Sequence, residues 1–310
     1  MTIINLIFSL IFLVISIIFC KKFSFLEDKK KDNHKKFLNT QKNHILGGLT
    51  LILFFGTHIL SKGEHMFFLF LLSIFLLGLI SDIRLLNDPK KRFFMQFVLI
   101  YLFTYLLDIN ILSTRIDLID EVLKNSLINY LFVTFCLMVL INGGNFIDGL
   151  NTLLSSYILI ILIVLALKSP ERIIDYNFFI TLIILLIVII LFNSFGLIIL
   201  GDSGAYLLSI FLGIYLIDYS NLNFGISPYL IILLLWYPCF ELLFSMTRRF
   251  LKKKNSYLPD TEHLHQIIYL AIKSKYNFKE KLNHIITSIL IISFNLIIFT
   301  VAMNFIFSTK

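Results

Sequence analysis

Four groups of polar residues interrupt an otherwise apolar sequence, and their residue types suit a phosphorylated ligand. They are Ser81-Asp82, NGGNFIDGLN from Asn142 to Asn151, Asn193 with the GDSG of Gly201 to Gly204, and Asp260 to His265. Carboxylates hold Mg²⁺ together with substrate phosphates. Glycines allow close backbone approach, and a helix starting at GDSG offers N–H groups and a favourable dipole to an anion. The combination predicts phosphoryl transfer assisted by Mg²⁺, with Mn²⁺ as the alternative ion.

Each group also has an ordinary structural explanation. NGGNFIDGLN could be a loop between two helices, Asp82 the solvated end of an apolar segment, and GDSG a capped helix start. His263 and His265 would point about 200° apart on a regular helix, although a loop or helix start could aim both at a diphosphate. The sequence has no HExxH motif, so zinc is not expected. Glu241, three residues after Pro238, is expected to orient a basic residue or a loop.

The elements that must position these groups are membrane helices. Hydrophobic residues make up 58% of the 310 residues, with 33 Phe, whereas a soluble domain must present a polar surface. The apolar runs are continuous, which favours helices over a barrel whose strands alternate. The three cysteines lie far apart and indicate packing. We expect an all-α integral membrane protein in which residues 1–310 form a single polytopic domain.

About ten apolar segments are candidates for transmembrane helices, and the first is expected to be a retained span rather than a signal peptide. Their approximate ranges are 2–20, 45–61, 66–80, 93–107, 127–141, 150–167, 177–192, 203–217, 229–246 and 285–306. If Met1 lies outside, 21 of the 27 Lys and Arg fall on the inner side, so the positive-inside rule predicts that both termini are outside. All four polar groups then share the inner side, which predicts one active site at the cytosolic face.

The formal charge of +8 therefore belongs mainly to one face, which would meet anionic headgroups or a phosphorylated ligand. Lys91, Arg92 and Arg249 are candidates to bind phosphate there. Nucleic acid is not an expected partner, because the basic loops lack interleaved aromatic residues. ATP is not indicated either, since Walker A and kinase motifs are missing from the sequence. The alternative class is a polytopic transporter or flippase. Such a protein would be expected to carry charged residues in the middle of its spans, and Glu241 is the one charged residue found there.

Taken in order along nearly the whole chain, the motifs resemble those of the polyprenyl-phosphate N-acetylhexosamine-1-phosphate transferase family. This family, glycosyltransferase family 4, includes the phospho-MurNAc-pentapeptide translocase and the undecaprenyl-phosphate GlcNAc-1-phosphate transferases. The matching segments are D.HKK..........GG from Asp32, GLISD followed by KKR...Q, NGGNFIDGLN, FNS.....LGDSGA and P..E......RR..........D..HLH. The resemblance implies a multi-pass protein of the bacterial inner (plasma) membrane.

The resemblance also implies a reaction and a set of site residues. A polyprenyl-phosphate oxygen would attack the sugar-bearing phosphate of a UDP-sugar directly, releasing UMP and leaving an N-acetylated sugar on a lipid diphosphate. Asp202 would be the metal ligand, Asp82 a carboxylate near the lipid phosphate, and His263 and His265 contacts of the diphosphate or sugar. Further residues would line or support the site, with Asp148 counted among the catalytic residues: Asp148, Gly149, Leu150 and Asn151 on the nucleotide side, and Asn142, Asn145 and Asn193 in support.

Three departures from the family pattern bear on specificity. Ser81 replaces the first acid of a pair, Asn151 and Thr152 replace an Asp and a Gly, and Gln266 replaces a third histidine. An amide in place of an acid changes the hydrogen bonds offered to a nucleobase. The departures imply a divergent sugar specificity in surface-polysaccharide assembly, such as lipopolysaccharide O-antigen, with the phospho-MurNAc-pentapeptide transferase as the alternative. The sugar, the lipid length and the oligomeric state are left open, with a homodimer as one option.

Overall fold

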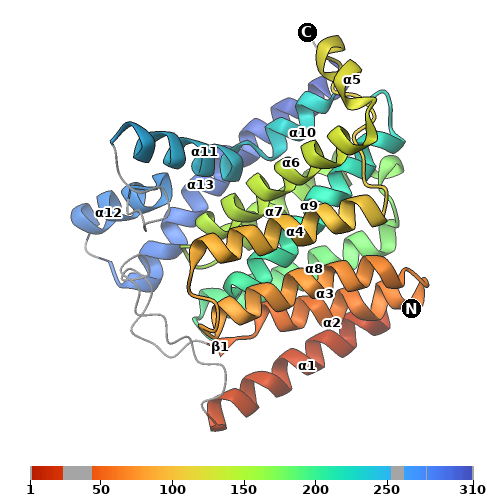
Figure 1. Cartoon of the computed structure of the whole chain (residues 1–310). Coiled ribbons are helices and arrows are strands. Elements are labelled where there is room, and N and C mark those ends of the chain that lie inside the picture. Colours follow the sequence, from red (N-terminus) through yellow and green to blue (C-terminus); the bar gives the residue numbers. More distant parts are fainter. Residues whose placement is uncertain (1, 24–43, 253–261, 277, 309–310) are drawn as a thin grey trace.

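A computed structural model of the chain describes residues 2–23, 44–252, 262–276 and 278–308, shown in Figure 1. Asp260 and most of the Asp32–Gly48 segment lie outside this description. The predicted all-α class is confirmed for the described part. Its helices are α1 Thr2–Phe23, α2 Gly47–Ser61, α3 His65–Asp82, α4 Pro89–Leu106, α5 Asp117–Leu123, α6 Ser126–Ile147, α7 Leu153–Lys168, α8 Tyr176–Ser194, α9 Gly201–Leu222, α10 Pro228–Leu234, α11 Trp236–Leu251, α12 Leu264–Tyr276 and α13 Glu280–Ala302, with short 3₁₀ turns at Pro170–Arg172 and Met303–Phe305.

Each of the ten predicted apolar segments falls on a helix or a bent pair, but the helices differ in length and polarity. Within the described residues, six are long and apolar enough to cross a membrane: α1, α3, α6, α8, α9 and the helix that begins at Glu280. The number rises to seven if α10 and α11 form one span. The 15-residue α2 and 16-residue α7 are apolar but short, because a rise of 1.5 Å per residue gives roughly 23 Å against a hydrocarbon core of about 30 Å. The protein is therefore membrane-embedded.

The candidate span at 229–246 is not one straight helix. The chain forms two helices there, α10 and α11, which bend by 70° at the break around Leu235. Pro238 lies in the first turn of α11, and a proline disfavours helical backbone in the residues before it because it lacks an N–H and its ring crowds the preceding turn. The bend turns α11 toward α12 at one end of the bundle (Figure 1).

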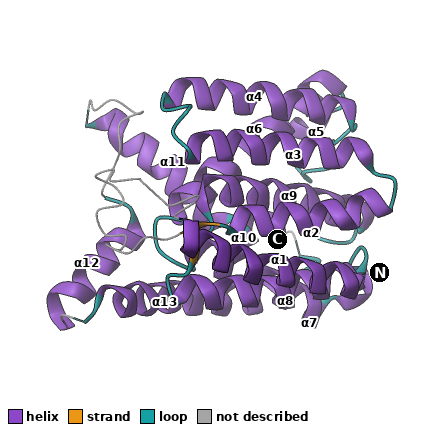
Figure 2. Cartoon of the chain, turned by 90° about the horizontal axis from the view of Figure 1, so that it is seen from below, coloured by secondary structure: helices purple, strands orange, loops and turns teal. Residues whose placement is uncertain are grey.

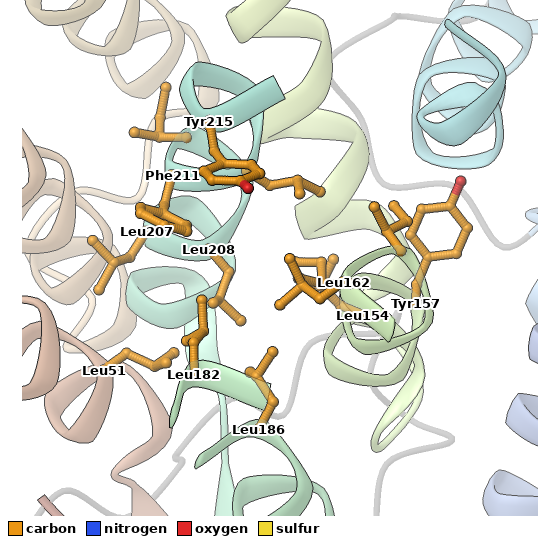
Figure 3. Packing of buried hydrophobic residues seen from close by; sticks show 14 of the residues in the cluster. Leu51, Leu154, Tyr157, Leu162, Leu182, Leu186, Leu207, Leu208, Phe211 and Tyr215 are labelled. Carbon is orange, nitrogen blue, oxygen red and sulfur yellow. The ribbon is translucent and has the colours of Figure 1, made fainter. Parts of the chain in front are cut away.

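Helix α9 is the central element of the fold. In its most apolar 18-residue window, 78% of the residues are buried, the highest fraction among the candidate spans. It packs against α2, α3 and α6, and Figure 2 shows the long helices running side by side around it. Figure 3 shows Leu208 and Phe211 of α9 among apolar side chains such as Leu51, Leu182 and Leu186. Burial of these side chains fixes the position of α9 and hence of the GDSG segment at its start.

The first turn of α9 is held by close backbone contacts from two neighbouring helices. A Cβ atom at Gly78 of α3 would lie 2.4 Å from the Cα of Ser203, and one at Gly48 of α2 would lie 2.7 Å from the backbone N of Gly204. Small residues permit such approaches between membrane helices. The glycines of α2 and α3 therefore bring polar backbone groups of three helices into one volume.

A short parallel strand pair adds a further connection that the sequence did not predict. Strand β1, His44–Ile45, pairs with β2, Ile198–Ile199, with His44 opposite Ile198. The N–H of Gly48 also donates to the carbonyl of Leu200 at 3.3 Å. Two-residue strands leave no alternating pattern to read. They tie the start of α2 to the segment that leads into α9.

Candidate active site

Asp82 ends α3 and binds the start of α9. Its Oδ1 accepts the N–H of Asp202 at 2.9 Å, while its Oδ2 accepts the N–H of Ser203 at 3.0 Å and the hydroxyl of Ser203 at 2.8 Å. A carboxylate at this position satisfies N–H groups that have no partner within their own helix and opposes the positive end of the helix dipole. Asp82 therefore serves as a cap supplied by another helix. Its predicted role near the lipid phosphate stays a prediction.

Asp202 lies beside Asp82 in a network with Ser81 and Arg92. The Ser81 hydroxyl donates to Oδ2 of Asp202 at 2.7 Å, and Nη1 of Arg92 lies 2.6 Å from the Ser81 Oγ and 3.2 Å from the same Asp202 oxygen. The Asp202 side chain is 5% exposed and that of Arg92 is 26% exposed. We call Ser81, Asp82, Arg92 and Asp202 the aspartate cluster. The structure thus brings the polar ends of α3 and α9 together.

The histidine segment lies at the start of a helix, which is one of the two arrangements expected to aim both histidines at one ligand. His263 immediately precedes α12, and the His263 and His265 rings stack at 5.5 Å with an angle of 6° between their planes. Buried Glu241 holds this start, because its Oε2 lies 3.1 Å from Nδ1 of His263 and its Oε1 accepts the N–H of Leu264 at 2.8 Å. Glu241 was expected to orient a basic residue or a loop, and its two contacts are with the His263 ring and the start of α12.

Gln266, which stands in place of a third histidine, has a local role. Its side-chain oxygen accepts the backbone N–H of His263 at 3.4 Å. A Gln three residues into a helix commonly reaches back to the N-cap in this way. Gln266 thus stabilises the start of α12 and does not provide the imidazole ring that a third histidine would bring to the site.

His265 is fully buried and faces the turn after α6. A Cβ at Gly149 would lie 3.0 Å from Nε2 of His265, and within the described part of the chain neither ring nitrogen has a hydrogen-bond partner. Burial, together with the nearby His263 and His284, lowers the pKa of His265 to about 3. The imidazole is therefore neutral at pH 7, with one N–H available to donate to a ligand.

The segment NGGNFIDGLN is largely helical, which corrects the expectation of a loop over 142–149. Helix α6 continues to Ile147, and Asp148 is its C-cap. The two internal glycines serve packing: a Cβ at Gly143 would lie 2.2 Å from the carbonyl oxygen of Pro238, and one at Gly144 would lie 2.1 Å from Oγ of Ser209. They bring α11 and α9 against the polar end of α6.

The remaining predicted residues occupy varied environments around this helix end. The Asn142 amide donates to the Gln96 side chain at 3.1 Å, which joins α6 to α4. Phe146, which the sequence analysis did not single out, contacts the His263 ring at 5.0 Å and lies 5.9 Å from the Arg249 guanidinium carbon. The others differ in exposure: Leu150, Asn151, Asn193 and Arg249 are buried, Asn145, Asp148 and Gly149 are half-buried, and Lys91 is exposed. We call Glu241, Phe146, Arg249, His263 and His265 the histidine cluster.

Asn151 and Thr152, two of the departures, are fixed by packing. The Asn151 carbonyl accepts the Ser288 hydroxyl of α13 at 3.1 Å. Thr152 precedes α7 with φ +72° and ψ −15°, in the left-handed region. A β-branched residue is rare there because its Cβ is crowded, whereas glycine has no such penalty. The turn retains the backbone shape that suits the glycine of the family pattern.

We expect the Thr152→Gly substitution to stabilise the protein. Removing the strained Cβ should raise the free energy of unfolding by roughly 0.5–1 kcal/mol after the entropy cost of glycine is included. The measurement is thermal unfolding in detergent. Thr57→Gly in the middle of α2 is the matched control, and it should lower stability by about 1 kcal/mol. A lower melting temperature for Thr152→Gly would contradict the strain argument.

The aspartate cluster can be tested for its fit to a divalent cation. The described residues hold no group of three or more His, Cys, Asp or Glu arranged to bind a metal, and Asp82 uses both oxygens on α9. Mg²⁺ does not require such a cage, because it retains water and commonly binds one or two carboxylates with substrate phosphates. Asp202 therefore fits a site of one carboxylate completed by ligand oxygens.

Residues 65–220 match the sequence profile of glycosyl transferase family 4. This range covers just over half of the chain and includes the aspartate cluster and the end of α6, and the chain belongs to this family. Undecaprenyl-phosphate alpha-N-acetylglucosaminyl 1-phosphate transferase of Thermotoga maritima is 26% identical to it over 284 residues, which cover 90% of this chain and 81% of that relative. The family resemblance predicted from the motifs is confirmed.

Proposed function

We propose that the protein transfers an N-acetylated sugar-1-phosphate from a UDP-sugar to undecaprenyl phosphate or a similar polyprenyl phosphate. The products would be UMP and a lipid-linked diphospho-sugar that starts a surface polysaccharide or cell-wall glycan. One observation carries the proposal: in a member of this family, Asp82 and Asp202 meet beside Arg92 at the ends of apolar helices. Such a position suits a reaction between a lipid phosphate and a water-soluble diphosphate. The activity printed for the Thermotoga relative supports the same reaction.

We further propose that the site faces the cytosol across a bacterial inner membrane, with ten spans in one domain and both termini outside. The support is the distribution of charge. Lys22 at the end of α1, Lys91 at the start of α4 and Arg248 at the end of α11 belong to the same predicted inner side, as positively charged residues of inner membrane proteins do. The N and C labels lie at the opposite end of the bundle from β1 and α12 (Figure 1).

The reaction would need little proton transfer from the protein. A phosphate monoester has a second pKa of about 6, so its attacking oxygen is already ionised at neutral pH. Attack would form the new bond to the sugar-bearing phosphorus as the bond to the UMP oxygen breaks. No general base is then required, which is consistent with Asp82 being occupied by α9. This favours direct attack over a covalent aspartate intermediate.

The side chains of the two clusters would bind and neutralise the diphosphate. Asp202 would hold Mg²⁺, which when bound offsets charge on the diphosphate and on the departing phosphate. Neutral His265 would donate its N–H to a phosphate or sugar oxygen, while Glu241 keeps His263 in place. Arg249, buried beside Phe146, would add a fixed positive charge near the same ligand.

The test is transfer by the purified full-length protein in detergent with Mg²⁺, undecaprenyl phosphate and a panel of labelled UDP-sugars. The panel includes UDP-GlcNAc and UDP-MurNAc-pentapeptide, and both UMP and lipid-linked product are measured. We expect product from an N-acetylated sugar other than the pentapeptide donor. Product from the pentapeptide donor alone would assign the other activity of the family. No product from any donor, together with substrate uptake into proteoliposomes, would support the transporter class instead.

A further inference from the structure

We propose that Arg92, which pairs with Asp202, gives up this position when a divalent cation binds and moves to the lipid phosphate. The inference rests on the proposed function and assigns a second position to a residue already expected to bind phosphate. Its basis is the sharing of one oxygen: Oδ2 of Asp202 accepts both the Ser81 hydroxyl and the Arg92 guanidinium.

Charge balance explains why Arg92 lies there. Two buried carboxylates are adjacent, and that of Asp82 is satisfied by the N–H groups of α9. Asp202 lies in the first turn of the same helix and is paired with the Arg92 guanidinium. A buried carboxylate is costly unless it is paired with a cation. Arg92 therefore supplies the positive charge that a divalent ion would supply in the loaded site.

A cation bound to Asp202 would repel the guanidinium. Two positive groups beside the same carboxylate oxygen repel each other strongly where burial limits screening by water. Arg92 can respond because its side chain is 26% exposed and lies in the first turn of α4. Neighbouring Lys90 and Lys91 are exposed on the same turn, so the guanidinium would move into a basic surface. A guanidinium binds phosphate through two parallel N–H groups, and the lipid phosphate is the anion available at that boundary.

Ser81 makes the exchange possible. Its hydroxyl donates to Asp202 and accepts from Arg92, so it joins the two side chains without adding charge. A carboxylate at this position would hold a cation and Arg92 at the same time. With serine, the two positive groups compete for the single carboxylate of Asp202. The replacement of the family acid thus becomes the feature that couples cation binding to release of Arg92.

The test measures Mn²⁺ binding to the full-length protein by electron paramagnetic resonance, without substrates. Arg92→Gln should bind Mn²⁺ about tenfold more tightly than wild type, because the competing charge is removed. The control is Lys91→Gln, which removes one positive charge from the neighbouring, exposed residue. It should change the Mn²⁺ affinity by less than about twofold. Ser81→Asp should also tighten binding through a second carboxylate. Equal affinities for Arg92→Gln and Lys91→Gln would overturn the inference.

A second measurement separates exchange from a structural role. In wild type, Mn²⁺ should tighten binding of undecaprenyl phosphate, and by reciprocity the lipid should tighten Mn²⁺ binding. Arg92→Lys, which keeps the charge but loses the paired N–H groups, should retain weak Mn²⁺ binding and lose most of this coupling. Coupling retained in Arg92→Lys would refute the movement to phosphate. If wild type transfers the sugar phosphate but Arg92→Gln binds Mn²⁺ no more tightly than wild type, the exchange is rejected and the proposed function stands. If wild type shows no transfer, the proposed function is rejected.

Discussion

Asp202→Asn should reduce transfer by roughly a thousandfold or more while leaving the protein folded. The amide has the shape of the carboxylate and can still accept hydrogen bonds from Ser81 and Arg92, so the first turn of α9 should persist. It cannot balance the Arg92 charge, and it is a poor ligand for Mg²⁺, which prefers charged oxygen. The measurement is release of UMP in the transfer assay, with gel filtration and thermal unfolding as checks on folding.

Asp117→Asn is the matched control for this substitution. Asp117 is an exposed acid in the first turn of α5, so the two variants lose the same charge at the first turn of a helix. We expect Asp117→Asn to keep its activity within about twofold, because an exposed charge away from the site contributes little. Full turnover by Asp202→Asn would remove Asp202 from the role of cation ligand.

The second large effect is expected from Gly78→Val, which acts on the backbone of the site. The new Cβ would lie 2.4 Å from the Cα and 2.6 Å from the N of Ser203, and backbone atoms in a packed helix pair cannot yield cheaply. Displacing the first turn of α9 would break the contacts of Asp82 with Asp202 and Ser203. Overpacking of this kind costs about 1–3 kcal/mol or more, and a displacement of about 1 Å at a site costs about a hundredfold in rate.

Two other glycines provide controls for the Gly78 substitution. At Gly225 a Cβ would make ordinary contact with the Phe307 ring at 3.5 Å, and at Gly56 it would meet the outer edge of the Phe68 ring at 2.8 Å, which can rotate away. We expect Gly225→Ala and Gly56→Ala to keep most of the activity and stability. The activity and stability of Gly78→Ala should be lower than theirs and higher than those of Gly78→Val. Wild-type activity in Gly78→Val would show that α3 does not hold α9 by direct backbone contact.

The sequence predicted the helices well because lipid-facing helices require long apolar runs, and it failed where packing overrides local composition. The glycines and asparagines of NGGNFIDGLN indicated a loop, but Gly143 and Gly144 lie in α6 and serve as contact points for α11 and α9. The break around Leu235 had a signal in Pro238, because a proline disfavours helical backbone in the residues before it. Composition alone does not distinguish a glycine that turns the chain from one that admits a neighbour.

The candidate site was predictable as a set of residues but not as a set of contacts. The common inner side of the charged loops and the polar groups pointed to Asp82 and Asp202 together. No sequence rule indicates that Asp82 would cap the helix that carries Asp202, because the two residues are 120 positions apart in the chain. The hydrogen bond between Ser81 and Arg92 likewise forms only because the ends of their helices meet in the folded protein. Such contacts depend on helix packing, to which the glycines of α2 and α3 contribute close approaches.

The burial of α9 has a consequence for how the protein is made. Its mean hydropathy of 1.3 is the lowest among the six candidate spans, and it is the most buried of them. A helix of this polarity is held weakly by lipid and strongly by protein neighbours. Its principal neighbours α2, α3 and α6 all precede it in the chain, so the ribosome delivers them to the membrane first. We therefore expect α9 to insert against helices that are already in the membrane, so that defects in α2 or α3 should lower the yield of inserted protein.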